Sequence, residues 1–592
     1  MIVDSKSSSF GELLTTNICP TDAQVDAVRS ALARPLECLS SLDSKIQSLE
    51  STLAELRAEK LSLQSYIDAH NSILSPTRRL PPEIVAAIFT YTLPHDHFPT
   101  RSSKASPLLL GRVCSQWRAV SLSTPELWNR MHIVIPSSAD SGLLCQVLTK
   151  RVEYVATWLS RAGALPISFS LYSYNWTQHA PFQEDRVIMS NILRSLMSSL
   201  FGLSKRWQRV EFKVPGILWK ILREYVTKLT AADVPMLESL KVDFNTWGIA
   251  DMTESELFHN MVESTPLRSV SFTGLCSKVS GMSLDWKHLQ HLQLTSKFND
   301  RFMNIPEVQN VLSQCHELRS CDIGVLVSAT PSPPSLDLPS VIALPHLRDL
   351  QLSLTCPNAP LSNLLPSFFQ SLSLPVLSSL SVSFEGKYSP VNRLPFFPLL
   401  APGHNVEKLM LHSSVLPLDP LIEVLEACPD LKTLKIEQPP PSFRGRAEGT
   451  LGEGLVMRLI GAGVHEMSHA SENGNGAAGP ALDPLCPSLE VIHLSNLDAK
   501  DELLLQFARS RTRASKGLTQ PQPNLHPNSI PNPVPKTTPL KVFHVRLPRY
   551  RQWFDIYARA EELKNQTGLD IQLVHSTEGA DGAGDGQETT AS

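Results

Sequence analysis

The sequence predicts an α/β protein with three parts: a long N-terminal helix, a group of three short helices, and a long series of alternating strands and helices. Three patterns predict these parts. Apolar residues keep a heptad spacing between Pro35 and Leu74, and short amphipathic segments follow between Leu80 and Ile135. From Trp207 onward one strand-like phrase returns, mostly at intervals of roughly 22 to 30 residues, with a long interruption before the last instance. A chain of 592 residues is long enough for several domains or one extended repeat array.

Composition and charge limit the classes of partner. The formal net charge of −4 at pH 7 gives no general attraction toward nucleic acid or acidic lipid, so we expect neither as a partner. No apolar run approaches the roughly 18 residues that span a bilayer, and the N-terminal segment lacks the apolar core of a signal peptide, so we expect a cytoplasmic or nuclear protein. The ten cysteines include no CxxC pair, which favours reduced thiols over a zinc cage or a disulfide framework.

The first part is a helix with a coiled-coil-like seam, predicted over residues 35–75 after a flexible N-terminus of residues 1–34. Its apolar residues alternate at steps of three and four, with Lys60 at the one polar seam position: Leu39, Leu42, Ile46, Leu49, Leu53, Leu56, Leu63 and Ile67. Pro35 suits a first helical position, and Pro76 ends the helix. One hypothesis is a homodimer through residues 36–74. The alternative is a long helix folded back on the neighbouring domain.

Three short helices are predicted in the second part. Pro81 and Pro82 fix the start of the first, which carries an apolar stripe, and a second stripe runs from Leu110 to Trp117. In the third, Thr124 can cap the helix and Pro125 can begin it. Three helices of this size bury little surface on their own, so we expect a partner to cover part of them.

The segments LPPEIVAAIF, VCSQWR and TPELWNRM, in this order and spacing, resemble the F-box pattern of a Leu-Pro-x-Glu helix, a Val-Cys-x-x-Trp helix and a closing Leu-Trp pair. The resemblance places an F-box at residues 78–136 and implies docking to the Skp-type adaptor of an SCF cullin ubiquitin ligase. It implies that five residues face the adaptor, namely Leu80, Pro81, Ile84, Ile88 and Phe89. It implies that five more build the core and contact ridge, namely Val113, Cys114, Trp117, Leu127 and Trp128.

One departure from the F-box pattern is the insertion HDHFPTRSSKAS between the first two helices, which we expect to loosen the docking geometry. Because the pattern is degenerate, a short apolar helical hairpin that serves only as a structural cap is the competing interpretation.

The third part repeats the phrase LxxLxL. Its ten instances begin at Trp207, Leu237, Leu267, Leu289, Leu318, Leu347, Leu377, Val406, Leu431 and Leu489. A period of this size is typical of leucine-rich repeats, in which each unit adds one short strand to its neighbour. We therefore predict an irregular leucine-rich repeat solenoid over residues 150–500. The alternative is an irregular α/β domain in which the phrase is accidental.

Prolines stand just before many of these phrases, where a residue without an amide donor ends the preceding helix: Pro235, Pro266, Pro345, Pro375, Pro429 and Pro487. Substrate recognition in such a solenoid is expected on the concave strand face, at variable positions of the phrase such as Lys241, Gln293, Gln351, His412 and Lys435.

Turn-forming composition marks further boundaries. We predict a mobile insertion at residues 438–486, a disordered linker at 511–538 and a disordered tail at 576–592. Residues 539–575 are expected to close the solenoid, with a last strand at Leu540, Phe543 and Val545 and a helix from Trp553 to Leu563.

The spelling HExxH occurs at His465 to His469, but glycine-rich sequence surrounds it, and a zinc peptidase needs these residues on a rigid helix with a third ligand. We interpret it as accidental. No P-loop, GxSxG elbow or supported nucleophile is present, so no catalytic residue, cofactor or metal is expected and the chain is predicted not to be an enzyme.

Three hypotheses follow. The first is a non-catalytic substrate receptor of an SCF-type ligase, with the adaptor and through it a cullin ligase as partners and an unknown protein as substrate. The second is a coiled-coil and leucine-rich repeat scaffold protein without ligase coupling. The third is a zinc peptidase around His465 and His469, which requires bound zinc.

Overall fold

The computed structural model describes most of the chain. The described residues are 9–136, 141–173, 183–214, 216–243, 258–263, 265, 267–274, 279, 282–296, 302–327, 341–356, 364–386, 393–400, 405–413, 416–438, 451–461, 483–512, 537–547 and 556–575. Their contacts divide the chain into two compact units, Met1–Ile88 and Phe89–Ser592. No helix within the described residues combines the length and apolarity needed to cross a membrane.

The first unit consists mainly of one long helix. Helix α2 runs over Asp22–Leu74, after the short helix α1 (Gly11–Thr15), and is followed by a 3₁₀ turn at Pro76–Arg79 and the start of helix α3 (Pro82–Tyr91). A capping box begins α2, in which the Thr21 amide donates to Gln24 Oε1 at 2.9 Å. The long N-terminal helix of the predicted α/β fold is therefore confirmed.

The predicted start of this helix was wrong. Pro35 lies inside α2 rather than at its first position, and residues 22–34, which were expected to be flexible, are helical. The capping box fixes the earlier start, and the alanine-rich stretch up to Pro35 favours helix strongly enough to offset the single backbone hydrogen bond that proline removes.

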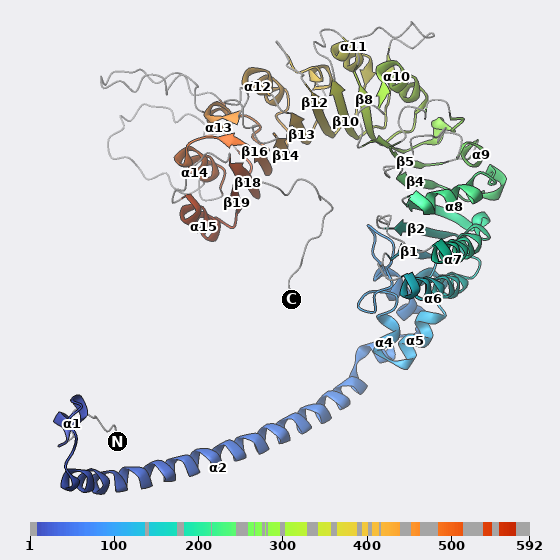
Figure 1. Ribbon diagram of the computed structural model, residues 1–592. Coiled ribbons are helices and arrows are strands. Elements are labelled where there is room, and N and C mark those ends of the chain that lie inside the picture. Colours follow the sequence, from blue (N-terminus) through green and yellow to red (C-terminus); the bar gives the residue numbers. More distant parts are fainter. Residues whose placement is uncertain are drawn as a thin grey trace, which may run out of the picture. The chain divides into compact units, whose positions relative to one another are not determined.

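The second unit is built on a parallel sheet of fifteen strands (Figure 1). Fourteen follow one another in the order β1-β2-β3-β4-β5-β6-β8-β10-β12-β13-β14-β16-β18-β19, and β7 pairs with β8. Their bounds are β1 Arg130–Ile135, β2 Ile167–Ser173, β3 Trp207–Lys213, β4 Ser239–Asp243, β5 Ser269–Thr273, β6 His291–Thr295, β7 Met303–Asn304, β8 Ser320–Leu326, β10 Asp349–Cys356, β12 Ser379–Gly386, β13 Lys408–Ser413, β14 Thr433–Glu437, β16 Val491–Ser495, β18 Val542–Leu547 and β19 Asp570–His575.

Helices connect the strands and lie along one face of the sheet (Figure 1). They are α6 Ser141–Ser160, α7 Gln183–Phe201, α8 Gly216–Val226, α9 His259–Val262, α10 Ile305–Gln314, α11 Leu364–Gln370, α12 Leu418–Glu426, α13 Glu453–Ile460, α14 Asp501–Ser510 and α15 Ile556–Thr567. Two small sheets pair β9 (Ile342–Ala343) with β11 (Leu372–Ser373) and β15 (Leu451–Gly452) with β17 (Leu497–Asp498). We call the opposite face of the large sheet the open face.

The repeated phrase accounts for the core. All thirty apolar residues of the ten LxxLxL phrases are buried, none of them more than 2% exposed. The parallel register stacks equivalent positions, so that Val210, Leu240 and Val270 lie side by side in β3, β4 and β5. Because side chains alternate along a strand, the variable positions of each phrase point to the open face.

The sheet extends beyond the phrases at both ends. Strand β1 lies within the range predicted for the F-box and pairs with β2, while β19 follows the strand that was expected to be the last. Neither β2 nor β19 contains the full LxxLxL phrase, and the repeated phrase therefore did not predict them. The predicted C-terminal helix is present as α15.

The predicted mobile insertion at 438–486 contains packed structure. Helix α13 buries Leu455, Val456 and Leu459, and the left-handed Gly461, with φ of 95°, ends it. The flanking glycines that suggested mobility therefore bound a helix. Residues 439–450 and 462–482 of the insertion, residues 513–536 of the predicted linker and the tail after residue 575 lie outside the described residues.

Candidate protein-binding sites

Helix α3 carries an apolar face that is exposed. Its backbone begins at the proline pair, where the Val85 amide donates to Pro81 O at 3.1 Å. Val85 and Phe89 lie on the buried side, whereas the side chains of Ile84, Ile88 and Tyr91 are 49%, 47% and 80% exposed. Because these three residues are spaced by four and three positions, they form one stripe along the helix.

The second predicted helix is two helices. Helix α4 (Leu110–Val113) ends at Cys114, and helix α5 (Ser115–Leu122) begins directly after it. Cys114 has extended backbone angles, and its Sγ accepts a hydrogen bond from the Trp117 amide at 3.4 Å, so it caps α5 instead of continuing an apolar stripe. The single predicted helix was therefore wrong at this residue.

The third predicted helix is a 3₁₀ turn over Pro125–Leu127. Leu127 and Trp128 after it are buried, and Trp128 Nε1 donates to Ser121 O at 2.7 Å. The Trp128 indole also lies edge-on to Trp158 of α6, at a centroid distance of 4.8 Å. We call the short helices from Pro82 to Leu127 the helical module. Its C-terminal end is thus packed against α6, the first helix that covers the sheet.

The ten residues that the resemblance singled out fall into three groups. Five are exposed: Pro81, Ile84, Ile88, Val113 and Cys114. Two are half-buried, Leu80 and Trp117, and three are buried, Phe89, Leu127 and Trp128.

Phe89 was expected to face the adaptor, and its side chain is buried instead. It is 1% exposed and contacts the Trp117 ring edge-on at 4.9 Å. Three exposed apolar residues of the same segment were missed, namely Tyr91, Leu109 and Leu122. For Leu109, the run of three leucines at 108–110 was an available signal.

The insertion between α3 and α4 is ordered along the first strand. The His132 amide of β1 donates to Pro99 O at 2.8 Å, and Arg130 Nη2 donates to Pro94 O at 3.3 Å. One backbone and one side-chain hydrogen bond therefore tie this connection to β1. The expected effect of the insertion on docking geometry stays a prediction.

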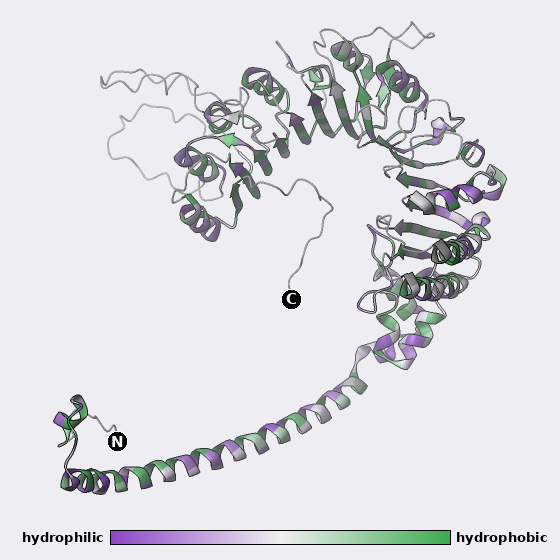
Figure 2. Cartoon of the chain, viewed as in Figure 1, coloured by the Kyte–Doolittle hydropathy of each residue, from purple (hydrophilic) through white to green (hydrophobic). Residues whose placement is uncertain are grey.

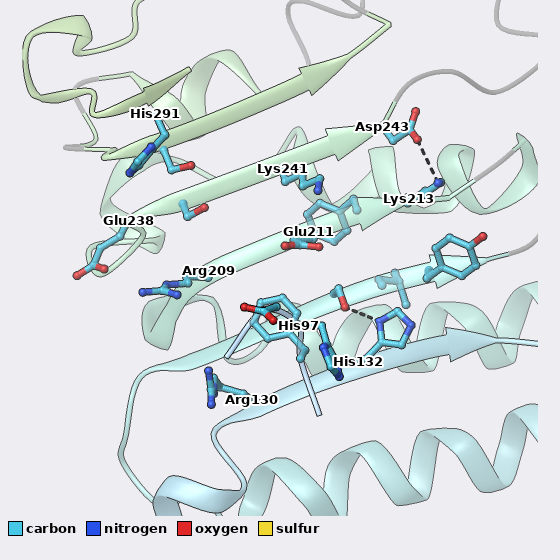
Figure 3. A pocket seen from close by; sticks show the side chains of 18 of the residues that line it. His97, Arg130, His132, Arg209, Glu211, Lys213, Glu238, Lys241, Asp243 and His291 are labelled. Atoms are coloured by element: carbon cyan, nitrogen blue, oxygen red, sulfur yellow. Dashed lines mark hydrogen bonds and ion pairs between the residues drawn. The ribbon is translucent and has the colours of Figure 1, made fainter. Parts of the chain in front are cut away.

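A pocket of about 830 Å³ opens where this insertion meets the open face (Figure 3). The insertion contributes residues 95–98 and Thr100, and strands β1 to β6 supply the rest of the lining. Lysine, arginine, aspartate, glutamate, histidine and serine side chains dominate the lining, in contrast to the apolar core on the other side of the same strands.

Two interactions order the pocket wall. His132 Nδ1 and Ser170 Oγ are 2.6 Å apart across β1 and β2, and Lys213 Nζ lies 3.8 Å from Asp243 Oδ2 (Figure 3). Burial, together with the nearby His97, lowers the pKa of the His132 imidazole. Burial and the neighbouring Arg209 guanidinium lower the pKa of Arg130.

The variable positions named from sequence are residues of this face. Lys241, Gln293, Gln351 and Lys435 occupy one register column through β4, β6, β10 and β14. In that column Ser271 Oγ donates to Gln293 Oε1 at 2.6 Å, and Gln293 Nε2 donates to Asp322 Oδ2 at 3.0 Å. The open face therefore carries organised polar side chains along its length.

Within the described part of the chain, no group of three or more histidine, cysteine, aspartate or glutamate side chains is placed to hold a metal ion. His465 to His469 lie outside the described residues. Eight cysteines of the described part of the chain are free thiols, and four of these are buried, Cys315, Cys321, Cys428 and Cys486; Cys19, Cys38 and Cys114 are exposed.

Comparison with known families agrees with the helical module. The F-box-like family matches residues 77–134, which span α3, the insertion, α4, α5 and the 3₁₀ turn and end within β1. The chain thus contains an F-box-like domain. No curated protein matches the chain. No catalytic family is indicated.

Proposed function

We propose that this chain is a non-catalytic substrate receptor of an SCF-type cullin ubiquitin ligase, acting in the cytoplasm or nucleus. The F-box-like domain docks to a Skp-type adaptor, and the large sheet binds a protein substrate. The observation that carries the proposal is the exposed apolar stripe of Ile84, Ile88 and Tyr91 within the F-box-like domain. Exposed apolar side chains gathered on one helix face favour a protein partner.

The sheet supports the receptor half of the proposal. We interpret it as an irregular leucine-rich repeat array, because each LxxLxL phrase coincides with one parallel strand and the register stacks them in sequence order. Such an array presents a long row of variable side chains on the open face, which suits recognition of an extended partner. In this role the chain contributes proximity and orientation, and the ligase partners carry out the chemistry.

The long helix supports self-association as an additional function. The eight seam residues from Leu39 to Ile67 are exposed, and apolar residues recur along α2 between polar ones (Figure 2). If Leu39 is assigned heptad position a, Lys45 falls at g and Glu50 at e of the next heptad, so a parallel pair of copies would place opposite charges together. Lys60 at position a lowers the stability of that pair and favours two strands over larger assemblies.

Adaptor capture tests the proposal. Purified Skp-type adaptor should retain the full chain, and retention should be lost in the double variant Ile84→Asp and Ile88→Asp. A matched control replaces Val187 and Ile188, two exposed apolar residues of α7, by aspartate and should bind as the native chain does. A folded native chain that the adaptor does not retain would favour the scaffold without ligase coupling.

A further inference from the structure

The lining of the pocket on the open face contains one more lysine or arginine than carboxylates. It includes five lysine and arginine residues, Arg130, Arg209, Lys213, Lys241 and Arg268, and four carboxylates, Asp96, Glu211, Glu238 and Asp243. Two of the carboxylates face a cation in the sheet. Asp243 pairs with Lys213, and Glu211 is opposite Lys241 in the β3–β4 register.

Asp96 and Glu238 are the remaining carboxylates of the lining, and Figure 3 shows Glu238 at the end of the pocket that holds Arg130 and Arg209. Both arginines belong to the first open-face column of the sheet, with Ser168 between them in the register. Their backbones are two strand spacings apart, roughly 10 Å, so two long side chains can reach a group held between them. Figure 3 shows both at the same end of the pocket. Within the described part of the chain, neither guanidinium forms an ion pair.

Two like charges held this close favour an anion between them. Arg130 is partly buried, and repulsion from Arg209 adds to the cost of keeping its charge. A carboxylate that accepts hydrogen bonds from both guanidiniums removes that repulsion, and guanidinium groups match carboxylate geometry well.

The shape and polarity of the pocket indicate what carries the carboxylate. The lining crosses six strands, β1 to β6, which at about 4.8 Å per strand is roughly 24 Å, the length of about seven extended residues. Sites for small molecules are mostly apolar, whereas this lining offers hydroxyl groups such as Ser170, Ser239 and Thr273. A nucleic acid needs several unpaired cations for its phosphates, and here Lys213 and Lys241 already face carboxylates.

We propose that the pocket formed by the F-box insertion and strands β1 to β6 binds an extended acidic peptide segment, one of whose carboxylates is held between Arg130 and Arg209. Binding of an acidic peptide does not depend on the proposed receptor function. Only the identification of that peptide as part of a substrate rests on it. It assigns the insertion a role, because the segment that interrupts the F-box pattern is the wall that closes one end of the pocket.

Binding of a defined peptide tests the proposal. The probe is a fluorescein-labelled peptide of alternating glutamate and serine, measured by fluorescence anisotropy with the full chain at 150 mM salt, beside the same peptide with lysine for glutamate. The glutamate peptide should bind, the lysine peptide should not, and the double variant Arg130→Gln and Arg209→Gln should weaken binding at least tenfold. Arg209 is exposed, so Arg209→Gln alone is not expected to disturb folding and should weaken binding by a smaller factor.

The matched control is the double variant Arg319→Gln and Arg348→Gln, two exposed arginines just before β8 and β10 that lie outside the pocket lining. It changes the net charge equally and should bind within about twofold of the native chain. Equal losses in both double variants, or no binding by the native chain, would overturn the proposal. So would an oligonucleotide of equal charge that outcompetes the peptide through the same arginines. Adaptor capture of Arg209→Gln, which lies outside the F-box-like domain, should be unchanged, and this separates failure of the pocket from failure of the receptor function.

Discussion

The His132 amide donates a hydrogen bond to the carbonyl oxygen of Pro99 at 2.8 Å, and this contact joins the F-box insertion to the first strand of the sheet. Arg130 on the same strand donates to Pro94 O, so two residues of β1 hold the insertion. The F-box-like domain therefore runs directly into the sheet. Strand β1 begins within the residues that match the family, and it is also the first strand of the sheet.

The buried guanidinium of Arg511 is expected to contribute strongly to the stability of the fold. Its side chain, in a residue 1% exposed, donates to the carbonyl oxygens of Leu459, Leu485, Cys486 and Pro487 at 2.8 to 3.3 Å. Arg511→Met leaves these acceptors without their donor, and we expect the free energy of unfolding to fall by about 2 to 4 kcal/mol.

Chemical denaturation followed by circular dichroism measures this loss. Arg509→Met, which changes an exposed arginine of α14, is the control and should stay within about 0.5 kcal/mol of the native chain. Equal midpoints for the two variants would show that the buried guanidinium adds no net stability.

The thiols should react in two classes. Burial raises the pKa of Cys428 to about 11 and of Cys315 and Cys486 to about 12, so these groups stay protonated and shielded at neutral pH. Iodoacetamide at pH 8 should alkylate the exposed cysteines first, namely Cys19, Cys38 and Cys114. Mass spectrometry of the native and the denatured chain reads out the difference, and early labelling of Cys428 or Cys486 would contradict this packing.

These same thiols affect stability at high pH. The folded pKa values lie above the ordinary value of 9.0, so the stabilisation is complete below about pH 9 and is lost as the pH rises toward about 12. We expect the denaturation midpoint of the native chain to fall in this window. In Cys486→Ala the fall should be shallower, and an identical slope would count against the burial of this thiol.

The contacts of Glu437 predict that the stability of the folded chain also depends on pH at acidic pH. Its contact with the His412 side chain, supported by Lys435, lowers the pKa of Glu437 to about 2. The folded state therefore keeps this carboxylate ionised where the unfolded chain is already protonated, and the stabilisation is lost as the pH falls from about 4.5 to about 2. The Glu437→Gln variant should show a flatter denaturation midpoint over this range than the native chain, and parallel curves would exclude the interaction.

The seam of α2 predicts a dimer of the full chain. Leu49→Glu with Leu53→Glu places charges in the seam and should shift sedimentation from dimer to monomer. Leu61→Glu is the control, because Leu61 is 71% exposed but lies beside the seam, not in it. A native chain that sediments as a monomer at high concentration would rule out the homodimer.

The strands were predictable because the buried residues of a repeated parallel strand recur at a fixed spacing in the sequence. Inward residues at every second position, preceded by a third apolar residue three places earlier, gave ten strands at the right residues: β3, β4, β5, β6, β8, β10, β12, β13, β14 and β16. Strands β2 and β19 were missed because each lacks part of the phrase, although Phe169 is fully buried. Strand β1 follows the phrase as Trp128, Met131 and Ile133, but Trp128 had been assigned to the closing pair of the F-box pattern.

The helical module was predictable in extent but not in detail. The sequence spacing of the apolar residues is compatible with one helix or with two: Leu110, Val113, Cys114 and Trp117. Only the extended backbone of Cys114 shows that the helix is interrupted there. The path of the insertion was also beyond the sequence, because the carbonyl oxygens of Pro94 and Pro99 that hold it leave no side-chain pattern.

Adaptor binding tests the central claim most directly. In a capture assay with purified Skp-type adaptor, the full chain should be retained, the variant Ile84→Asp with Ile88→Asp should be lost, and Val187→Asp with Ile188→Asp should be retained. Each variant should first show the circular dichroism spectrum of the native chain. Retention of the Ile84 and Ile88 variant at native level, or no retention of the native chain, would contradict the proposed receptor function.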